Sequence, residues 1–573
     1  MRHHLHLGHS YRVFAVAALA LAVGCSRSER PADGGAIREA AAAVPRSAAA
    51  TFLQALARDG RAAGERLAAD CADRPSYLAL RRSALASLSA WRRCNGMAAE
   101  ATFGPEVALQ EAGGSLGALD RAMTAGDCAA ARQAVHNIGS AFRVADEVLG
   151  RRAIHPAVFV QALSDAAYRL GEATLESTPY VPEGDDAALA DVLGLLDFLE
   201  GGVRALDLDV GPRVTPLLPL RQARTMSEVT DRAAIVRATG ALGAAIRSAA
   251  RTRGLATNPM IRPLHETAEV SALTLPRPAA PSGEAEASLG RALFFDPRLS
   301  RGAVRSCASC HVPERAYSDG RVAPASLDPG APLRRNTPSL LYAPLEALLM
   351  WDGSVRTADR QAMRVIHARG EMGLTDEELT RVVSSDRRYE DGFRGAFHEE
   401  VTPLDIGLAL SAYEASALVP GTAPIDRFAR GDAGALSAAA SAGFDVFAGQ
   451  GRCARCHVPP TFGGSRSPDF TAPVFAVLGV PSAPGARAVD ADPGRDGAFK
   501  VPTVRNVGRT APYFHHGRYP TLEQVVDFYD RGGGRGLGLE VPNQDPEIRP
   551  LHLSSEDKRV LLVFLREALD DDR

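Results

Sequence analysis

Two short runs of cysteine and histidine are the residues of this chain best suited to chemistry. They read CASCH at 307–311 and CARCH at 453–457. In a C-x-x-C-H run the two thiols bond the vinyl groups of a c-type haem, and the adjacent histidine becomes a ligand of the haem iron. The sequence therefore predicts two covalently bound haem c groups. The attachment residues are Cys307, Cys310 and His311 for the first haem and Cys453, Cys456 and His457 for the second.

A single C-x-x-C-H run has three other interpretations, namely a chance pentapeptide, half of a zinc site or a thioredoxin-like dithiol. Two such runs, each with a histidine directly after the second cysteine, disfavour chance. No further cysteine or histidine pair stands near either run to complete a zinc site. Covalent haem is therefore the interpretation on which the remaining expectations depend.

The composition is that of a globular protein with several domains. The chain has 573 residues, of which 46% are hydrophobic and 23% are charged, and its formal net charge is −3. This length predicts two to four domains. A net charge so near zero provides no whole-chain attraction to nucleic acid or to an anionic membrane, so we expect neither as a partner.

The N-terminus has the pattern of an export signal. Arg2 and Arg12 precede an apolar run at 13–23 that is too short to span a bilayer. The run ends in LAVGC, which resembles a bacterial lipobox and predicts cleavage before Cys25 and lipidation of its thiol. An ordinary signal peptide is the alternative. Either one predicts a periplasmic protein, and the lipobox predicts a membrane anchor through the lipid on Cys25 alone, with Ser26 favouring the outer membrane.

A long segment without haem motifs follows the signal. Residues 49–262 are rich in alanine, leucine and arginine with helical periodicity and almost no strand signals, which predicts an all-α domain of unknown role. One amphipathic helix is expected at 185–206. Thr225 and Glu228 have the spacing of a capping box, which predicts a second helix at 229–251.

Three cysteines of this helical segment are not used by the haem motifs. They are Cys71, Cys94 and Cys128. Because a protein outside the cytoplasm retains disulfides, we expect one disulfide and one remaining thiol. The sequence leaves the pairing open.

Two related units come after a linker rich in proline and alanine. Each contains a helix that ends near a phenylalanine, then a haem motif, then a stretch rich in turns. We therefore predict a mainly α protein in which a helical N-terminal domain precedes two cytochrome c-like haem domains. The predicted order is a signal peptide at 1–24, a tether at 25–48, the all-α domain at 49–262, the linker at 263–285, the first haem domain at 286–435 and the second at 436–573.

Residues 286–573 resemble the bacterial di-haem cytochrome c peroxidase family, including its MauG branch. Besides the two haem motifs, the matching runs are LGRALFFDPRLS, RRNTPSL, MWDGS, EMG, IDRF, FKVPTVRN, TAPYFHHG and TLEQVVDFY, and they occur in the family's order. The resemblance covers about half the chain. It implies a haem-dependent enzyme in which hydrogen peroxide reacts at the first haem and the second haem transfers electrons.

The sixth ligand of the second haem follows from the same resemblance. The last methionine is Met372, so the second unit contains no thioether. Relatives with histidine–methionine ligation place the methionine where Tyr529 stands, and the MauG branch carries tyrosine there. The resemblance therefore implies His457/Tyr529 ligation and a reduction potential below that of a methionine-ligated haem. The alternatives are His515, His516 or Lys500 as the ligand, or no sixth ligand.

The first haem is expected to have an open sixth position. Peroxidases of the family place a removable histidine between the first haem motif and the RNTP-like run, whereas this chain has no histidine at 312–366. The resemblance assigns Glu371 as the acid that moves a proton during O–O cleavage, and an apolar pocket would raise its pKa. Gln361 belongs to the same pocket, but Val365 replaces the family's usual proline and puts the pocket's shape in doubt. Alternatively, Glu371 is only a charge near a helix start.

Two further sites rest on resemblance. Trp351 matches the tryptophan between the haems, where an indole relays electrons; its alternative role is a turn anchor before Asp-Gly. Asn336, Thr510 and Pro512 match an interhaem calcium site that uses one amide and two backbone carbonyls, and oxygen-only ligation suits Ca²⁺. We therefore expect one Ca²⁺ in addition to the haems.

These residues predict a peroxidase that reduces hydrogen peroxide to water with electrons from a periplasmic donor, such as a small cytochrome c or a cupredoxin. A MauG-like oxidase that acts on a side chain of a protein substrate is one alternative. A di-haem electron carrier without turnover is the other. A last helix at 554–569, with Ser554 and Asp557 at its start, is expected to close the second haem domain.

Overall fold

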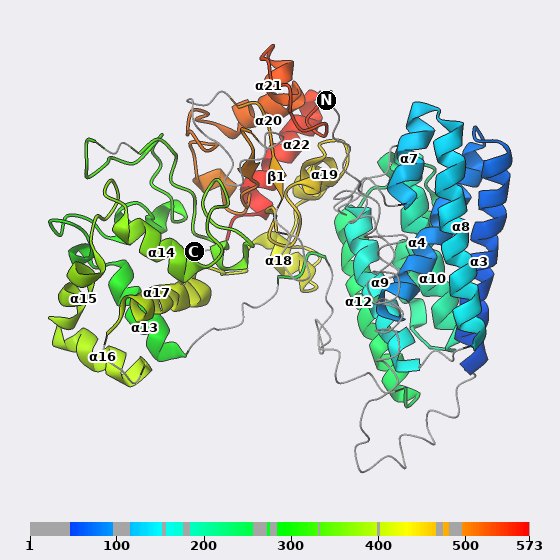
Figure 1. Cartoon of the computed structure of the whole chain (residues 1–573), viewed down its shortest axis with the longest axis horizontal. Helices are drawn as coiled ribbons and strands as arrows, with labels where there is room; N and C mark the ends of the chain where they lie inside the picture. Colours follow the sequence, from blue (N-terminus) through cyan, green and yellow to red (C-terminus); the bar gives the residue numbers. More distant parts are fainter. Residues whose placement is uncertain are drawn as a thin grey trace, which may run out of the picture. The chain divides into compact units, whose positions relative to one another are not determined.

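The computed structural model describes residues 46–94, 115–151, 156–175, 184–255, 272–275, 283–330, 333–397, 401–465, 474–480 and 496–571 (Figure 1). These residues are mainly helical, which confirms the predicted fold class. The predicted signal peptide and Cys25 lie outside the described residues. Within the described part, no helix is both long and apolar enough to cross a bilayer.

The chain divides into two compact units. The first comprises 1–167, 182–214 and 242–267, and the second comprises 168–181, 215–241 and 268–573. Both haem motifs therefore belong to the second unit. Residues 168–181 and 215–241, which the sequence analysis assigned to the all-α domain, also belong to the second unit.

The first unit is built from long helices packed side by side. They are α3 (Arg46–Ala69), α4 (Arg74–Cys94), α7 (Ser115–Ala125), α8 (Cys128–Arg151), most of α9 (Pro156–Thr174) and α10 (Asp185–Ala205). The observed α10 confirms the amphipathic helix expected at 185–206. A disulfide joins Cys71 to Cys128 and so settles the pairing that the sequence left open. In the core, Arg81 is fully buried between Asp120 and Asp191, at 2.5 and 2.7 Å.

The second unit consists of shorter helices separated by turns. Before the first haem motif it contains α11 (Leu218–Gln222), η3 (Met226–Glu228), the first part of α12 (Arg232–Thr252), α13 (Glu284–Phe294) and η4 (Pro297–Leu299). The first haem module continues with η5 (Cys307–Ser309), η6 (Pro313–Arg315), η7 (Ala343–Leu345), α14 (Ala358–His367), α15 (Asp376–Ser384), α16 (Arg387–Phe397) and α17 (Pro403–Ala417).

The second haem module follows directly. Its elements are α18 (Pro424–Ala429), α19 (Ala438–Ala448), η8 (Cys453–Arg455), β1 (Phe475–Ala476), β2 (Phe499–Lys500), η10 (Val507–Arg509), α20 (Leu522–Asp530), α21 (Gly533–Gly536), α22 (Ser555–Val563) and the π-helical turn η11 (Phe564–Ala568). The strands β1 and β2 form one antiparallel pair, and no other strand occurs in the described residues.

The two haem modules repeat one helix crossing. In the first, α13 packs on α17, where the Cβ of any larger residue at Gly290 would collide with the carbonyl of Ala409. In the second, α19 packs on α22, where Gly443 meets the carbonyl of Val560 in the same way. Each crossing lies at the helix that precedes a C-x-x-C-H motif. The same helix crossing therefore recurs beside both motifs.

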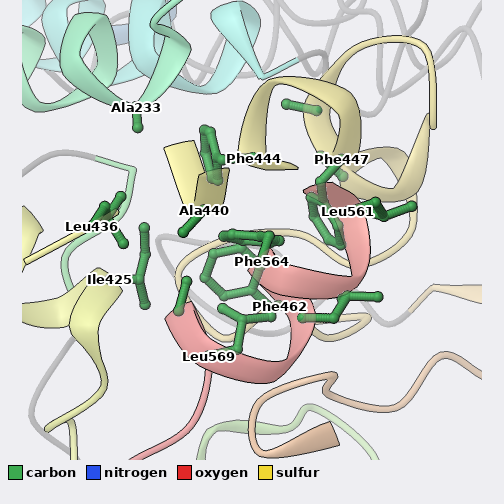
Figure 2. Close-up of a cluster of buried hydrophobic side chains, with 14 of the residues drawn as sticks. Ala233, Ile425, Leu436, Ala440, Phe444, Phe447, Phe462, Leu561, Phe564 and Leu569 are labelled. Atoms are coloured by element: carbon green, nitrogen blue, oxygen red, sulfur yellow. The ribbon is translucent and has the colours of Figure 1, made fainter. Parts of the chain in front are cut away.

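Aromatic side chains form the core of the second haem module. Phe444 and Phe447 on α19 contact Phe564 at centroid distances of 5.3 and 5.2 Å, and Phe462 joins them from the loop after the second motif (Figure 2). All four are essentially inaccessible to solvent. This cluster fixes the motif loop against the terminal helix.

Of the two capping boxes predicted from the sequence, one is present and the other is absent. Ser554 and Asp557 form the expected capping box at the start of α22. The capping box expected at Thr225 is absent, because Thr225 makes no side-chain cap and precedes only the turn η3. The following helix, α12, begins at Arg232, where Asp445 of α19 accepts hydrogen bonds from the first backbone amides. A cap that arrives from a distant segment leaves no local signal.

Candidate di-haem site

One cavity of about 790 Å³ contains both haem motifs. It is lined by Cys307, Cys310, His311, Cys453, Cys456 and His457, together with residues from loops of both modules. None of these four cysteines forms a disulfide. A single apolar chamber with two thiol pairs and the imidazoles of both motifs on its walls fits two covalently bound haems.

Each motif histidine is oriented by a backbone carbonyl. The Nδ1 atom of His311 lies 3.0 Å from the carbonyl oxygen of Tyr317, and Nδ1 of His457 lies 3.0 Å from that of Pro502. This hydrogen bond places the proton on Nδ1 and leaves Nε2 for a metal. Burial lowers the pKa of both rings, that of His457 to about 4, so they are neutral, as metal ligation requires.

The thiol pKa values of the motif cysteines differ from those of a redox dithiol. Burial raises the pKa of Cys307 and Cys453 to about 12. A thioredoxin-like pair needs a lowered thiol pKa to form the reactive thiolate. These buried thiols therefore lack the activation typical of a redox dithiol, which favours attachment of a cofactor.

The wall beside the first motif carries an amide and an acid. Gln361 and Val365 lie one turn apart on α14, which continues unbroken through Val365, and Glu371 follows in the turn after that helix. Burial raises the pKa of Glu371, although Arg364 and Arg305 partly oppose this effect. A half-buried carboxyl that holds its proton more tightly than usual is suited to proton transfer.

No described residue supplies a histidine opposite His311. Among the described residues, the histidines that line the cavity are His311, His457 and His515. The nearest candidate in sequence, His367, is 42% exposed at the end of α14 and pairs with Asp376 at 2.9 Å. Among the described residues of the cavity wall, His515 is therefore the one histidine outside the two motifs.

Tyr529 projects from α20 toward the second motif. It lines the cavity and packs on Phe514 and Phe528 at 6.2 and 5.5 Å. Burial, together with the nearby thiols of Cys456 and Cys453, raises its pKa. Within the described residues its hydroxyl has no hydrogen-bond partner, so no described group stabilises the ionised phenol.

Of the alternative ligands, Lys500 and His516 are engaged by other groups, whereas His515 lines the cavity and its buried Nε2 has no hydrogen-bond partner among the described residues. Lys500 is paired with Glu346 at 3.4 Å. Nδ1 of His516 accepts a hydrogen bond from the backbone of Arg518. The ring of His515 stacks on Phe499 at 3.7 Å, and burial lowers its pKa to about 3. The Tyr529 hydroxyl has no hydrogen-bond partner among the described residues, although its ring packs on Phe514 and Phe528.

Trp351 connects the two modules. Its Nε1 atom donates to the carbonyl of Asn336 at 2.8 Å, and its own carbonyl accepts from the backbone amide of Lys500 at 2.9 Å. Its ring lies edge-on to His515 at 6.4 Å. The indole is therefore held on the cavity wall by residues of both modules.

The predicted calcium ligands line the same cavity. Asn336, Thr510 and Pro512 all belong to its wall. The backbone amide of Asn336 donates to the carbonyl of His515, and its Nδ2 donates to the carbonyl of Arg321 at 2.6 Å. This arrangement leaves the side-chain oxygen of Asn336 as an acceptor. The described residues contain no cluster of three or more metal-binding acids, histidines or cysteines, so a cation here would depend on neutral oxygens.

Sequence reasoning missed one acid in the cavity. Glu414 on α17 is only 5% exposed, lines the cavity and has a pKa that burial raises to about 8. The sequence did contain a signal for this buried acid. Glu414 follows Leu410 by four residues and Ile406 by eight, so it lies on the apolar face of the helix.

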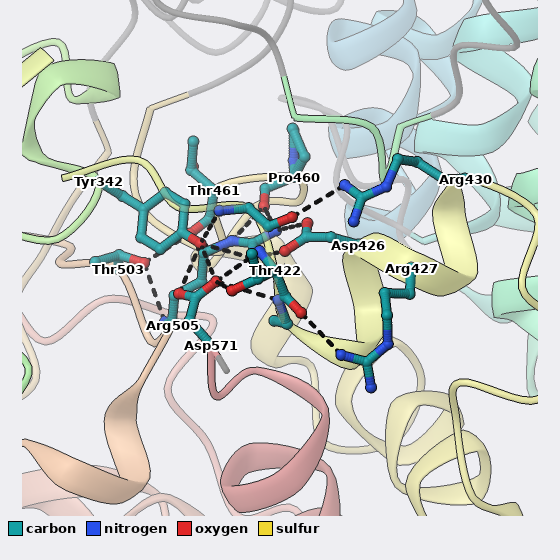
Figure 3. A network of polar contacts seen from close by, with 12 residues as sticks. Tyr342, Thr422, Asp426, Arg427, Arg430, Pro460, Thr461, Thr503, Arg505 and Asp571 are labelled. Carbon is teal, nitrogen blue, oxygen red and sulfur yellow. Dashed lines mark hydrogen bonds and ion pairs between the residues drawn. The ribbon is translucent and has the colours of Figure 1, made fainter. Parts of the chain in front are cut away.

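A buried polar network holds the loop that orients His457 (Figure 3). Arg505 pairs with Asp426 at 2.8 Å and donates to the carbonyl of Pro460, and both charged side chains are almost fully buried. Tyr342 of the first module donates to Asp571 near the end of the described chain. The network joins the segments on both sides of the second haem motif.

Comparisons with known proteins identify one family that this chain resembles. A family model described as di-haem cytochrome c peroxidase matches residues 284–434. Cytochrome-c peroxidase IdrP2 from Denitromonas iodatirespirans is 33% identical over 53% of this chain and 86% of its own length. Methylamine utilization protein MauG from Methylorubrum extorquens is 34% identical over 51% and 80%, and cytochrome c551 peroxidase from Pseudomonas aeruginosa is 34% identical over 49% and 82%.

The fold and site thus define a di-haem c-type oxidoreductase, and the chain belongs to the di-haem cytochrome c peroxidase family. It carries two c-type haems.

Proposed function

We propose that this protein reduces hydrogen peroxide to water with electrons from a small periplasmic redox protein, a cytochrome c or a cupredoxin. The observation that carries the proposal is the asymmetry of the cavity. An amide and an acid, Gln361 and Glu371, line it beside the first motif, and a phenol, Tyr529, lines it beside the second. A pure electron carrier has no use for an acid beside an open coordination position.

When bound, the two haems supply the iron chemistry that takes two oxidising equivalents from peroxide. The Glu371 carboxylate accepts the proton of the inner peroxide oxygen and returns it to the outer one, so that the leaving group is water. Gln361, held on α14 beside Met350, orients the peroxide through its amide. The raised pKa of Glu371 allows it to carry the proton between the two oxygens.

Tyr529 and His457 are proposed as the two residues that would hold the iron of the second haem. A phenolate is a hard anionic donor that favours ferric over ferrous iron. The positive charge of ferric iron would stabilise the ionised form of this buried phenol. Trp351, held by both modules, is proposed as the electron relay between the haems.

A second function has a specific observation in its favour. MauG-named relatives match this chain as closely as the peroxidases do, and the second module offers a tyrosine and no methionine. In this alternative, the electrons come from a side chain of a protein substrate.

One experiment separates these functions. The holoenzyme is mixed with hydrogen peroxide and reduced small cytochrome c as the sole reductant. Oxidation of about two cytochromes per peroxide supports the proposed function. Peroxide-dependent change of the haem spectrum without cytochrome oxidation favours the protein-oxidising alternative. Absence of any reaction with peroxide leaves only the electron carrier and contradicts both enzyme proposals.

Two further features belong to this proposal. We propose that Asn336, Thr510 and Pro512 hold one Ca²⁺, which is tested by metal analysis of the holoenzyme before and after treatment with a calcium chelator. We propose that the protein is periplasmic and anchored by a lipid on Cys25, with the outer membrane favoured. A Cys25→Ser variant should then leave the membrane fraction.

A further inference from the structure

A buried ion pair joins the two haem modules on the cavity wall. Glu346 follows η7 in the first module, and Lys500 ends β2 in the second. The Nζ atom of Lys500 lies 3.4 Å from Oε2 of Glu346, and the two side chains are 11% and 4% exposed. Both residues line the haem cavity. Neither has a role in the proposed peroxide chemistry.

The Glu346 carboxylate rests against the loop that follows His457. Its Oε2 accepts a hydrogen bond from Ser465 at 3.2 Å, and Ser465 in turn accepts one from the backbone amide of Ala347 at 2.7 Å. Its Oε1 is buried and has no hydrogen-bond partner among the described residues. A Cβ atom at Gly463 would collide with this oxygen, so the glycine provides the space that the carboxylate occupies.

Lys500 belongs to the segment that orients the histidine of the second motif. Two residues after it, the carbonyl of Pro502 holds Nδ1 of His457. Burial is the main cause of the lowered pKa of His457, and the ammonium of Lys500 lowers it further. The charge of Lys500 therefore acts at the histidine that binds the second haem. In a site removed from water, charges a few ångströms apart interact strongly.

We propose that Glu346 sets the reduction potential of the second haem by neutralising Lys500. An unpaired ammonium beside this haem would disfavour the loss of an electron and raise its potential, and the carboxylate reverses that effect. The proposal rests on the proposed function, in which the second haem stores one oxidising equivalent and therefore needs a low potential. Glu346 is a positioning residue in this scheme, because it acts through Lys500 and does not touch peroxide.

The test measures the midpoint potential of the second haem by spectroelectrochemical titration of the holoenzyme at one pH. Glu346→Gln should raise the potential by an amount equal to about a tenfold change in the ferric–ferrous equilibrium, which is 59 mV for one electron. Lys500→Met should lower it. The double variant should return close to the wild-type value, because each substitution removes the charge that the other leaves unpaired.

The matched control is Glu556→Gln on α22. Glu556 also forms an ion pair, with Arg559, but the two side chains are 67% and 57% exposed. This variant should leave the potential unchanged. The proposal is wrong if Glu346→Gln moves the potential no further than the control, or if it and Lys500→Met move it in the same direction, as general loosening of the site would do. Peroxide turnover is measured separately, so a protein inactive toward peroxide would defeat the proposed function without changing this result.

Discussion

Glu371 and Glu414 are two acids of one cavity, and they differ in their surroundings. Burial raises the pKa of both, but Arg364 and Arg305 oppose this effect at Glu371, whereas burial acts alone on Glu414. The two guanidinium groups therefore favour the ionised form of Glu371, which is the form that accepts a proton in the role proposed for it.

The first prediction concerns Glu371→Gln. Peroxide reduction should slow by roughly 10²- to 10⁴-fold, because the amide cannot accept the peroxide proton. The absorbance of both haems should be unchanged. In the wild type the carboxylate is the active form, so the rate should fall as the pH drops through the raised pKa of Glu371, and the variant should lack this acid limb. Stopped-flow rates between pH 4 and 9 would check both effects, and a rate equal to wild type would remove Glu371 from the mechanism.

The second prediction concerns Tyr529→Phe. Loss of the oxygen donor should raise the potential of the second haem by on the order of 100 mV, a fraction of the range that axial ligands span. The electron paramagnetic resonance signal of that haem should change as well. Tyr519→Phe is the control, since Tyr519 packs on the same Phe514 at 4.9 Å but does not line the cavity. If both variants leave the potential unchanged, the ligand is another group.

The residues that sequence alone could identify are those with a fixed spacing. The two C-x-x-C-H motifs define their own chemistry, and the structure places both in one cavity. Glu346 could not be found this way, because its importance comes from a lysine 154 positions later and from the space that Gly463 leaves. Contacts of that kind exist only in the folded chain.

Whether the start of a helix could be predicted from the sequence also depends on whether its cap is local or distant. The start of α22 was predictable because Ser554 and Asp557 lie three residues apart and cap it themselves. The start of α12 was not, because its cap is Asp445, more than two hundred residues away. The recurrence of two units was the only sequence signal for the helix crossings. Gly290 and Gly443 allow the close approach of the helices, but this role is visible only once the partner helices are known.

The third prediction concerns the loops that the Arg505 network holds. Arg505→Met should reduce the free energy of unfolding of the haem modules by about 3–5 kcal/mol, because it leaves the Asp426 carboxylate buried without its ion pair. Arg427→Met is the comparison. Arg427 is half-buried and donates to a backbone carbonyl, that of Thr422, so its loss should cost about 1 kcal/mol. Denaturant unfolding followed by haem absorbance would measure both, and equal effects would contradict the importance of the buried pair.

At the level of the molecule, both haem motifs belong to one compact unit, and the cavity wall is built from both modules. The sequence predicted two successive haem domains but gave no measure of how closely they associate. That association depends on contacts such as Trp351 with Asn336 and Lys500. The first unit contributes a helical core with a disulfide and a buried Arg81 network, and none of its described residues lines the haem cavity.

The fourth prediction concerns this association. Trp351→Phe should slow electron transfer between the haems by about tenfold or more, because it removes the indole and its hydrogen bond to the carbonyl of Asn336. Each haem should keep its own spectrum and potential. The measurement is the delay between the spectral changes of the two haems after one equivalent of peroxide is added. The chain has two tryptophans, and the other, Trp91 on α4, belongs to the first unit, so Trp91→Phe is a matched control that should leave the delay unchanged. An equal delay in wild type and Trp351→Phe would mean that electrons pass between the haems by another route.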